Sequence, residues 1–146
     1  MITAEQWKTI EETLKYGLFK QVKFKLPRDG HIVTVHKTFI AENKTAIVVW
    51  IDGERSDGWG WPDSDNFRPL VKEVWKRKTF RPGDRIIRRL SKTKEGKRLL
   101  KQKENASLYE VREYWLYMFD TASQLVKQYR TIPGLELITE PEPTNV

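Results

Sequence analysis

Cysteine is absent from this chain of 146 residues. Without a thiol, the protein can form no disulfide, hold no metal through a thiolate and use no cysteine as a nucleophile. A chain without cysteine fits a reducing compartment, and we expect the protein to act in the cytoplasm.

Long apolar runs are missing as well. No stretch approaches the ~20 consecutive apolar residues that a membrane-spanning helix needs, and Met1-Ile2-Thr3-Ala4 does not begin like a signal peptide. We therefore expect a soluble protein without a membrane partner.

Histidine is scarce, and its placing argues against a metal site. The two histidines, His31 and His36, are five positions apart on a strand-like run, so their side chains point to opposite faces and cannot bind one ion together. His36-Lys37-Thr38 matches half of a two-histidine phosphoesterase signature, but the chain has no second copy.

The acidic residues give no stronger signal for catalysis. Asp63-Ser64-Asp65-Asn66 begins like a calcium-binding loop, but the glycine and the glutamate that such a loop requires do not follow. Pro62-Asp63 and Glu95-Gly96-Lys97 leave a small metal-dependent nuclease open as an alternative. We expect no catalytic residue, no cofactor and no bound metal.

Positive charge is abundant and is concentrated in one stretch. Residues 72–103 contain 14 Lys and Arg against three acids, a net charge of +11, whereas the whole chain carries +7 and the remainder therefore −4. Exposed helices usually mix both signs. Charge segregation of this size indicates a polyanionic partner, with DNA or RNA as the first candidate and an acidic protein surface as the second.

The candidate contacts with such a partner are basic side chains within this stretch. They are Lys76, Arg77, Lys78, Arg81, Arg85, Arg88, Arg89, Lys92, Lys94, Lys97 and Arg98. Pro82 suits the first position of a helix. On that helix, an apolar arc formed by Ile86, Ile87 and Leu90 lies opposite a basic arc. The basic arc consists of Arg85, Arg88, Arg89 and Lys92.

Two tryptophans, Trp59 and Trp61, lie in a glycine-rich loop near Phe67. They are candidates for stacking on bases or anchoring a protein partner. Alternatively, one or both cap the open end of a small sheet. We favour the second interpretation, because the two residues have the same parity and both could face the core from a strand.

The first half of the chain predicts a helix followed by an antiparallel sheet. Thr3 and Gln6 form a capping box, and apolar residues at helical spacing predict a helix over 4–16 that ends at Gly17. Alternating and β-branched runs predict strands over 22–26, 32–39 and 46–51. Strands joined by short turns form a meander, and we expect a small, SH3-like sheet with 46–51 at its centre.

The second half predicts further helices and a return to the sheet. The helical phase breaks between Ser91 and Gly96, which indicates two short basic helices with a joint. A capping box at Ser107 and Glu110 precedes an apolar stripe, which predicts one long amphipathic helix of about 24 residues. Residues 135–138 are expected to return as an edge strand.

The expected fold class is therefore α+β. It combines an N-terminal helix, a small antiparallel sheet, a basic helical segment and a long C-terminal amphipathic helix. We expect 1–139 to form a single domain that includes the basic segment 72–103, and 140–146 to form a disordered tail.

Short motifs scattered over most of the chain add a further indication. They are Gln6-Trp7, Ile10-Glu11, Leu14, Tyr16-Gly17, Asp29-Gly30, Phe67-Arg68-Pro69, Tyr114-Trp115 and Leu135-Glu136-Leu137-Ile138. In these motifs the chain resembles a family of uncharacterised small proteins encoded by bacteriophages and prophages. The resemblance implies a phage accessory protein inside a bacterial cell, of a kind that often binds and blocks host machinery. It implies no activity and no site residue.

The leading hypothesis is a non-catalytic, phage-type accessory protein that binds DNA or RNA through the basic helical face. The first alternative is a phage inhibitor that binds a host protein complex, in the manner of an anti-CRISPR protein, through the same face or through the Trp59 and Trp61 loop. The second is the small metal-dependent nuclease.

Overall fold

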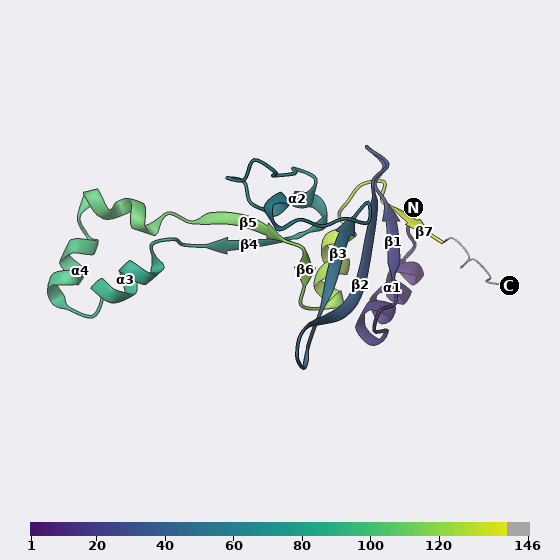
Figure 1. The fold of residues 1–146 in the computed structure, drawn as a ribbon, viewed down its shortest axis with the longest axis horizontal. Coiled ribbons are helices and arrows are strands. Elements are labelled where there is room, and N and C mark those ends of the chain that lie inside the picture. The colour runs from purple at the N-terminus through teal and green to yellow at the C-terminus, as the bar shows by residue number, and fades with distance from the viewer. Residues whose placement is uncertain (140–146) are drawn as a thin grey trace. The chain divides into compact units, whose positions relative to one another are not determined.

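The computed structural model describes residues 1–139 of the chain (Figure 1). It has an α+β fold with a five-stranded sheet, a second sheet of two strands and several helices, so the expected fold class is confirmed. The expected tail, 140–146, lies outside the described residues.

Helix α1 (Ala4–Tyr16) begins and ends where the sequence predicts. The Thr3 side chain accepts a hydrogen bond of 3.1 Å from the Gln6 backbone, and the Gln6 side chain accepts one of 2.9 Å from the Thr3 backbone. These two bonds complete the capping box. The side chains that the helix buries are Trp7, Ile10 and Leu14.

The larger sheet has the strand order β6-β3-β2-β1-β7, and all its pairings are antiparallel. Its strands are β1 (Val22–Lys25), β2 (Ile32–Ala41), β3 (Lys44–Ile51), β6 (Met118–Phe119) and β7 (Glu136–Ile138). Strand β7 confirms the predicted edge strand. The middle strand is β2 rather than the 46–51 run, because β1 and the added edge strand β7 lie on one side of β2, and β3 and the short β6 lie on the other.

The sheet is open, so the strands do not form the SH3-like sheet that the meander suggested. Its edges are β6 and β7, and no pairing joins them among residues 1–139. After β3 the chain turns at Asp52 and Gly53, which have φ of 52° and 77°, but the turn leads only to a bridge between Ile51 and Glu54. A 3-10 helix, η1 (Asp57–Gly60), follows instead of a further strand.

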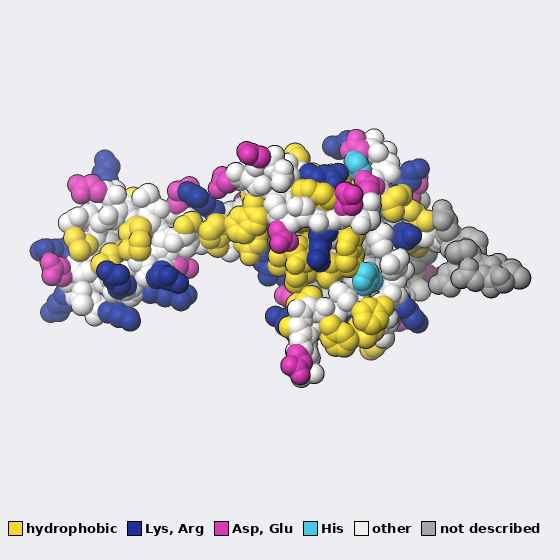
Figure 2. Space-filling view, viewed as in Figure 1, with side chains coloured by type: hydrophobic (Ala, Val, Ile, Leu, Met, Phe, Trp, Pro, Cys, Tyr) yellow, Lys and Arg dark blue, Asp and Glu magenta, His cyan; other side chains and the backbone are white. Residues whose placement is uncertain are grey.

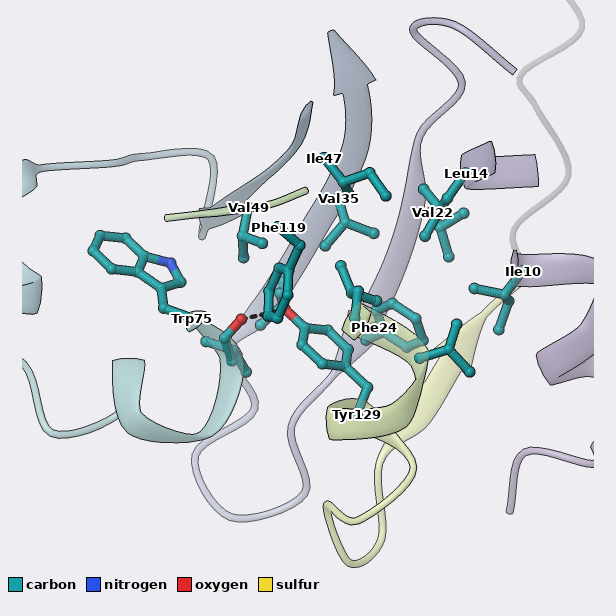
Figure 3. Close-up of a cluster of buried hydrophobic side chains, with 14 of the residues drawn as sticks. Ile10, Leu14, Val22, Phe24, Val35, Ile47, Val49, Trp75, Phe119 and Tyr129 are labelled. Carbon is teal, nitrogen blue, oxygen red and sulfur yellow. Dashed lines mark hydrogen bonds between the residues drawn. The ribbon is translucent and has the colours of Figure 1, made fainter. Parts of the chain in front are cut away.

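The main core lies between this sheet, α1 and helix α5 (Ala122–Tyr129), as Figure 3 shows. The ring of Phe24 on β1 meets that of Tyr129 edge-on, with centroids 5.3 Å apart. The buried Tyr129 hydroxyl donates a hydrogen bond of 2.6 Å to the carbonyl of Val74, the last residue of α2 (Val71–Val74). Burial raises the pKa of Tyr129 well above its ordinary value. The hydroxyl therefore remains a neutral donor that ties α5 to α2.

The predicted long C-terminal helix is wrong. The chain forms instead the 3-10 helix η2 (Lys103–Tyr109), strand β5 (Arg112–Leu116), strand β6 and the short helix α5. Val111, Trp115 and Phe119 are spaced by four residues, and because four is an even number this spacing places side chains on one face of a strand as well as of a helix. The aromatic-rich run 114–119 favours extended backbone, and only the residues from Ala122 onward remain helical.

The contacts divide the chain into two compact units. One contains Met1–Lys76 and the chain from Trp115 onward, and the other is Arg77–Tyr114, which we call the basic unit. The basic unit contains the helices α3 (Asp84–Leu90) and α4 (Lys94–Leu100), η2, and parts of the paired strands β4 (Lys76–Phe80) and β5. Lys76 of β4 and the last two residues of β5 belong to the other unit. The joint between α3 and α4 confirms the predicted break in the helical phase.

Candidate nucleic-acid interface

The positive charge of the chain is concentrated in the basic unit. Its 38 residues hold 13 Lys and Arg against five Asp and Glu, a net charge of +8. The rest of the chain holds 14 Lys and Arg against 15 acids, a net charge of −1, which with +8 makes the +7 of the whole chain. Most of the positive segment seen along the sequence, 72–103, therefore lies within one structural unit.

Close backbone contacts join the helices of the basic unit. The Thr93 side chain caps α4 by accepting a hydrogen bond of 2.9 Å from the backbone of Gly96. Gly96 is buried against the end of α3, where a Cβ would lie 1.8 Å from the Leu90 carbonyl oxygen. Asn105 in η2 donates a hydrogen bond of 2.7 Å to the Leu99 carbonyl. These contacts set the orientation of α3, α4 and η2 within the unit.

The core of the basic unit is very small. Within residues 77–114, all of which the structure describes, Leu100 is the one buried side chain apart from glycines. Ile86 is 50% exposed, and Ile87 and Leu90 are only half-buried, so the apolar arc of α3 is incompletely covered. A unit with so few buried apolar groups depends on its backbone contacts for order.

Seven of the predicted contacts are exposed in this unit. They are Arg85, Arg88, Arg89, Lys92, Lys94, Lys97 and Arg98. No carboxylate within residues 1–139 forms an ion pair with any of them. Figure 2 shows Lys and Arg side chains gathered along one side of this unit. The positive electrostatic field of these seven side chains is therefore available to an external anion.

Two exposed lysines of the same unit, Lys101 and Lys103, were not among the predicted contacts. They follow α4 directly, and the charge run that led to the other residues extends over them. They are candidates of the same kind.

Two predicted arginines have carboxylate partners inside the basic unit. Arg77 pairs through Nε with Glu113, and Arg81 pairs through Nε with Asp84 at the start of α3. The Arg81 guanidinium also lies 5.6 Å from the centre of the Tyr109 ring. Lys78, between them on β4, is half-buried. The two arginines therefore take part in the internal contacts of the unit.

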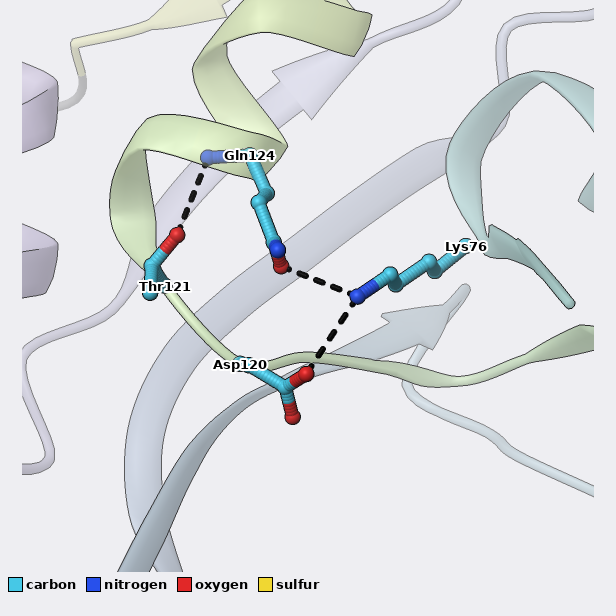
Figure 4. A network of polar contacts seen from close by, with 4 residues as sticks. All are labelled: Lys76, Asp120, Thr121 and Gln124. Atoms are coloured by element: carbon cyan, nitrogen blue, oxygen red, sulfur yellow. Dashed lines mark hydrogen bonds and ion pairs between the residues drawn. The ribbon is translucent and has the colours of Figure 1, made fainter.

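Lys76 belongs to the other unit and is also engaged. Its ammonium group donates a hydrogen bond of 3.0 Å to the Gln124 side-chain oxygen and lies 3.3 Å from a carboxylate oxygen of Asp120 (Figure 4). The lysine side chain is 20% exposed. Lys76 therefore connects the start of β4 to the N-terminal end of α5.

The two loop tryptophans differ in their surroundings. Trp59 is half-buried, and its ring stacks on the buried Trp75 with centroids 6.2 Å apart. The Arg68 guanidinium covers Trp59 at 4.5 Å from the ring centre. Trp61 is 41% exposed. Trp59 thus packs against the core, in line with the interpretation that at least one of the pair covers the sheet.

The histidines lie in two separate environments. His31 pairs with Asp52 at 2.5 Å between Nδ1 and Oδ2. His36 stacks on Trp50 with ring centroids 4.4 Å apart, and burial lowers the pKa of His36 below its ordinary value of 6.5. Among residues 1–139, no group of three or more His, Asp and Glu is arranged to hold a metal ion.

No family model, no curated protein and no solved structure matches this chain. In the part of the chain that the structure describes, no helix is both long enough and apolar enough to cross a membrane.

Proposed function

We propose that the protein binds DNA or RNA through the basic unit, as a non-catalytic accessory protein. The observation that carries the proposal is the set of seven exposed Lys and Arg side chains between Arg85 and Arg98 that lack a carboxylate partner within residues 1–139. Phosphates would supply the missing negative charge, and the counterions released from the nucleic acid would drive binding. The resemblance of the chain's short motifs to those of phage-encoded proteins suggests that the protein acts in the cytoplasm of a bacterial host.

The proposed contacts differ between the two helices. Helix α3 contributes the arginines Arg85, Arg88 and Arg89, whose planar guanidinium groups can each bind a phosphate through two hydrogen bonds. Helix α4 contributes Lys94, Lys97 and Arg98, of which the lysines act as point charges. Contacts of this kind fix the protein on the backbone and read no sequence, so we expect affinity without strong base preference.

The salt dependence of binding tests the proposal. If all seven side chains contact phosphates of duplex DNA, the logarithm of the association constant should fall with the logarithm of the salt concentration with a slope of about −6. Between about 50 and 200 mM salt the affinity would then fall by roughly 10⁴-fold. Absence of binding at about 50 mM salt, or a flat salt dependence, would refute the proposal.

A matched pair of variants separates the basic unit from the net charge of the chain. Arg88→Glu with Arg89→Glu reverses two charges on α3, and Lys8→Glu with Lys127→Glu reverses two exposed charges in the other unit. We expect the first pair to weaken binding and to make the salt slope shallower by about 2, because two phosphate contacts are lost. The second pair should leave the slope unchanged. Equal effects of both pairs would assign the binding to net charge alone.

A host protein with an acidic surface is the second candidate partner. The observation in its favour is that the basic unit also exposes apolar side chains, with Ile86 50%, Tyr109 44% and Val111 63% exposed. Phosphates would not cover these groups, whereas a protein surface could. A stoichiometric protein partner that persists after nuclease treatment of a bacterial lysate, and that Arg88→Glu with Arg89→Glu releases, would favour this candidate.

A further inference from the structure

A second surface, in the unit that holds the larger sheet, carries exposed aromatic side chains. Phe19 and Phe39 are 59% and 56% exposed, and their rings meet edge-to-face with centroids 6.4 Å apart. We call these two residues the aromatic patch. Tyr16, the last residue of α1, and Leu18, in the connection between α1 and β1, are 76% and 39% exposed. Large apolar side chains that gather at the surface usually mark a contact with a partner.

The backbone holds Phe19 in place at a conformational cost. Its φ is 63°, in the left-handed region that bulky side chains seldom adopt. The Phe19 N–H donates a hydrogen bond of 2.8 Å to the Lys37 carbonyl on β2, and Leu18 forms a bridge with the same residue. Burial of the phenylalanine ring does not repay this strain, because most of the ring faces water. Strain kept at an exposed aromatic residue points to a role in binding.

The charged groups along the two chain segments that carry the patch are mostly lysines. Residues 15–20 and 37–44 contain four lysines, Lys15, Lys20, Lys37 and Lys44, and a single acid, Glu42. The Lys37 ammonium group donates a hydrogen bond of 2.9 Å to the Lys15 carbonyl, which joins the two segments. A local charge of +3 contrasts with the −1 of the whole chain outside the basic unit. An anionic ligand is therefore favoured over a neutral apolar one.

Exposed aromatic rings next to lysines match one class of anion in particular. Single-stranded nucleic acid offers both unpaired base faces and phosphates, and proteins bind it by stacking the bases on aromatic side chains within a basic surface. In a duplex the base faces are covered by neighbouring base pairs, so the rings would have no partner there.

We propose that the aromatic patch stacks unpaired bases of single-stranded nucleic acid while the neighbouring lysines contact its phosphates. The proposal rests on the proposed function in that it assigns a second, strand-selective contact to the same class of ligand. The basic unit then supplies affinity for any strand, and the aromatic patch supplies a preference for single strands.

The test compares a fluorescently labelled oligothymidine with a duplex of the same length, using the full-length chain. Three double variants replace both Phe19 and Phe39: by alanine, by leucine and by tyrosine. We expect alanine and leucine to weaken single-strand binding by about tenfold or more, tyrosine to retain it, and duplex binding to stay unchanged. Thermal unfolding of each variant checks that the fold is kept.

The leucine variant separates stacking from simple apolar contact, because leucine keeps apolar volume without a ring face. If leucine retains single-strand affinity, or if alanine leaves it unchanged, the aromatic patch does not stack bases. The proposed function is tested independently by Arg88→Glu with Arg89→Glu. If the arginine variant loses affinity for both single strands and duplex, and the phenylalanine variants lose neither, the basic unit binds and the aromatic patch does not. If only the phenylalanine variants lose affinity, the patch binds and the proposed role of the basic unit is wrong. If the unmodified chain bound neither the single-stranded oligothymidine nor the duplex, both proposals would be overturned.

Discussion

Gly96 allows the arrangement of the basic side chains to be tested without changing any charge. It lies buried in α4, against the last residue of α3. A Cβ on Gly96 would lie 1.8 Å from the Leu90 carbonyl oxygen and 2.6 Å from its carbonyl carbon. Gly96→Ala must therefore push α3 and α4 apart, and with them the arginines and lysines that they carry.

Two effects of opposite sign determine the outcome. Alanine favours a helix interior over glycine by about 1 kcal/mol, which would stabilise α4. Against this, ordinary contact begins at 3.4 Å, so the Cβ and the oxygen must separate by 3.4 − 1.8 = 1.6 Å. Overpacking typically costs about 1–3 kcal/mol, and we expect the upper end because the clash is with backbone rather than with a mobile side chain. The net effect is a destabilisation of roughly 2 kcal/mol.

Hydrogen exchange on the full-length chain shows which segments Gly96→Ala destabilises. Because the basic unit buries so little, we expect it to open locally. Peptides that cover 84–100 should lose protection in Gly96→Ala, while those that cover β2 and β3 keep theirs. The affinity for duplex DNA should fall although the charge is unchanged.

Gly58→Ala is the matched control, since its Cβ would meet the Ser64 hydroxyl at 3.0 Å, and that side chain can move. It should leave the exchange of the basic unit unchanged. If Gly96→Ala instead increased protection in α4, as helix propensity alone would have it, the close approach of α3 and α4 would be wrong.

Two further predictions concern the other unit. Tyr129→Phe should lower the free energy of unfolding by about 1–2 kcal/mol in urea titrations, because the Val74 carbonyl loses its buried donor; Tyr16→Phe, at a 76% exposed position, should have no effect, and equal losses would contradict this role. Burial lowers the pKa of His36 below 6.5, so the unfolded chain takes up the proton first as the pH falls. The free energy of unfolding should therefore decrease below about pH 6.5 until the pKa of the folded state is passed, and His36→Gln should reduce this decrease; an unchanged pH profile in that variant would assign it to another group.

The first half of the fold could be predicted because its signals are local. The capping box of α1 involves residues three positions apart, and the alternation along β1 appears directly in its pattern of buried and exposed side chains. Charge could be predicted in the same way, since the basic residues lie close together in one stretch of the chain. The seven exposed cations from Arg85 to Arg98 could therefore be predicted from the sequence, whereas Lys101 and Lys103, at the end of the same charge run, were missed.

Sorting the basic residues into paired and unpaired ones required the structure. The partners of Arg77 and Lys76, Glu113 and Asp120, are 36 and 44 positions away in the sequence, and no local pattern connects them. The aromatic patch also escaped prediction, because Phe19 and Phe39 meet only through the pairing of the post-α1 segment with β2.

The sequence by itself thus determined the helix α1, the strands β1 to β3, the break between α3 and α4, and the separation of charge, all of which depend on neighbours within a few residues. Only the tertiary structure decided that residues 111–119 lie in β5, in β6 and next to them rather than in a helix. The apolar residues Val111, Trp115 and Phe119 are spaced by four, which fits the period of a strand as well as that of a helix. The pairing of β6 with β3, and of β5 with β4, resolves that ambiguity through hydrogen bonds to strands remote in the sequence.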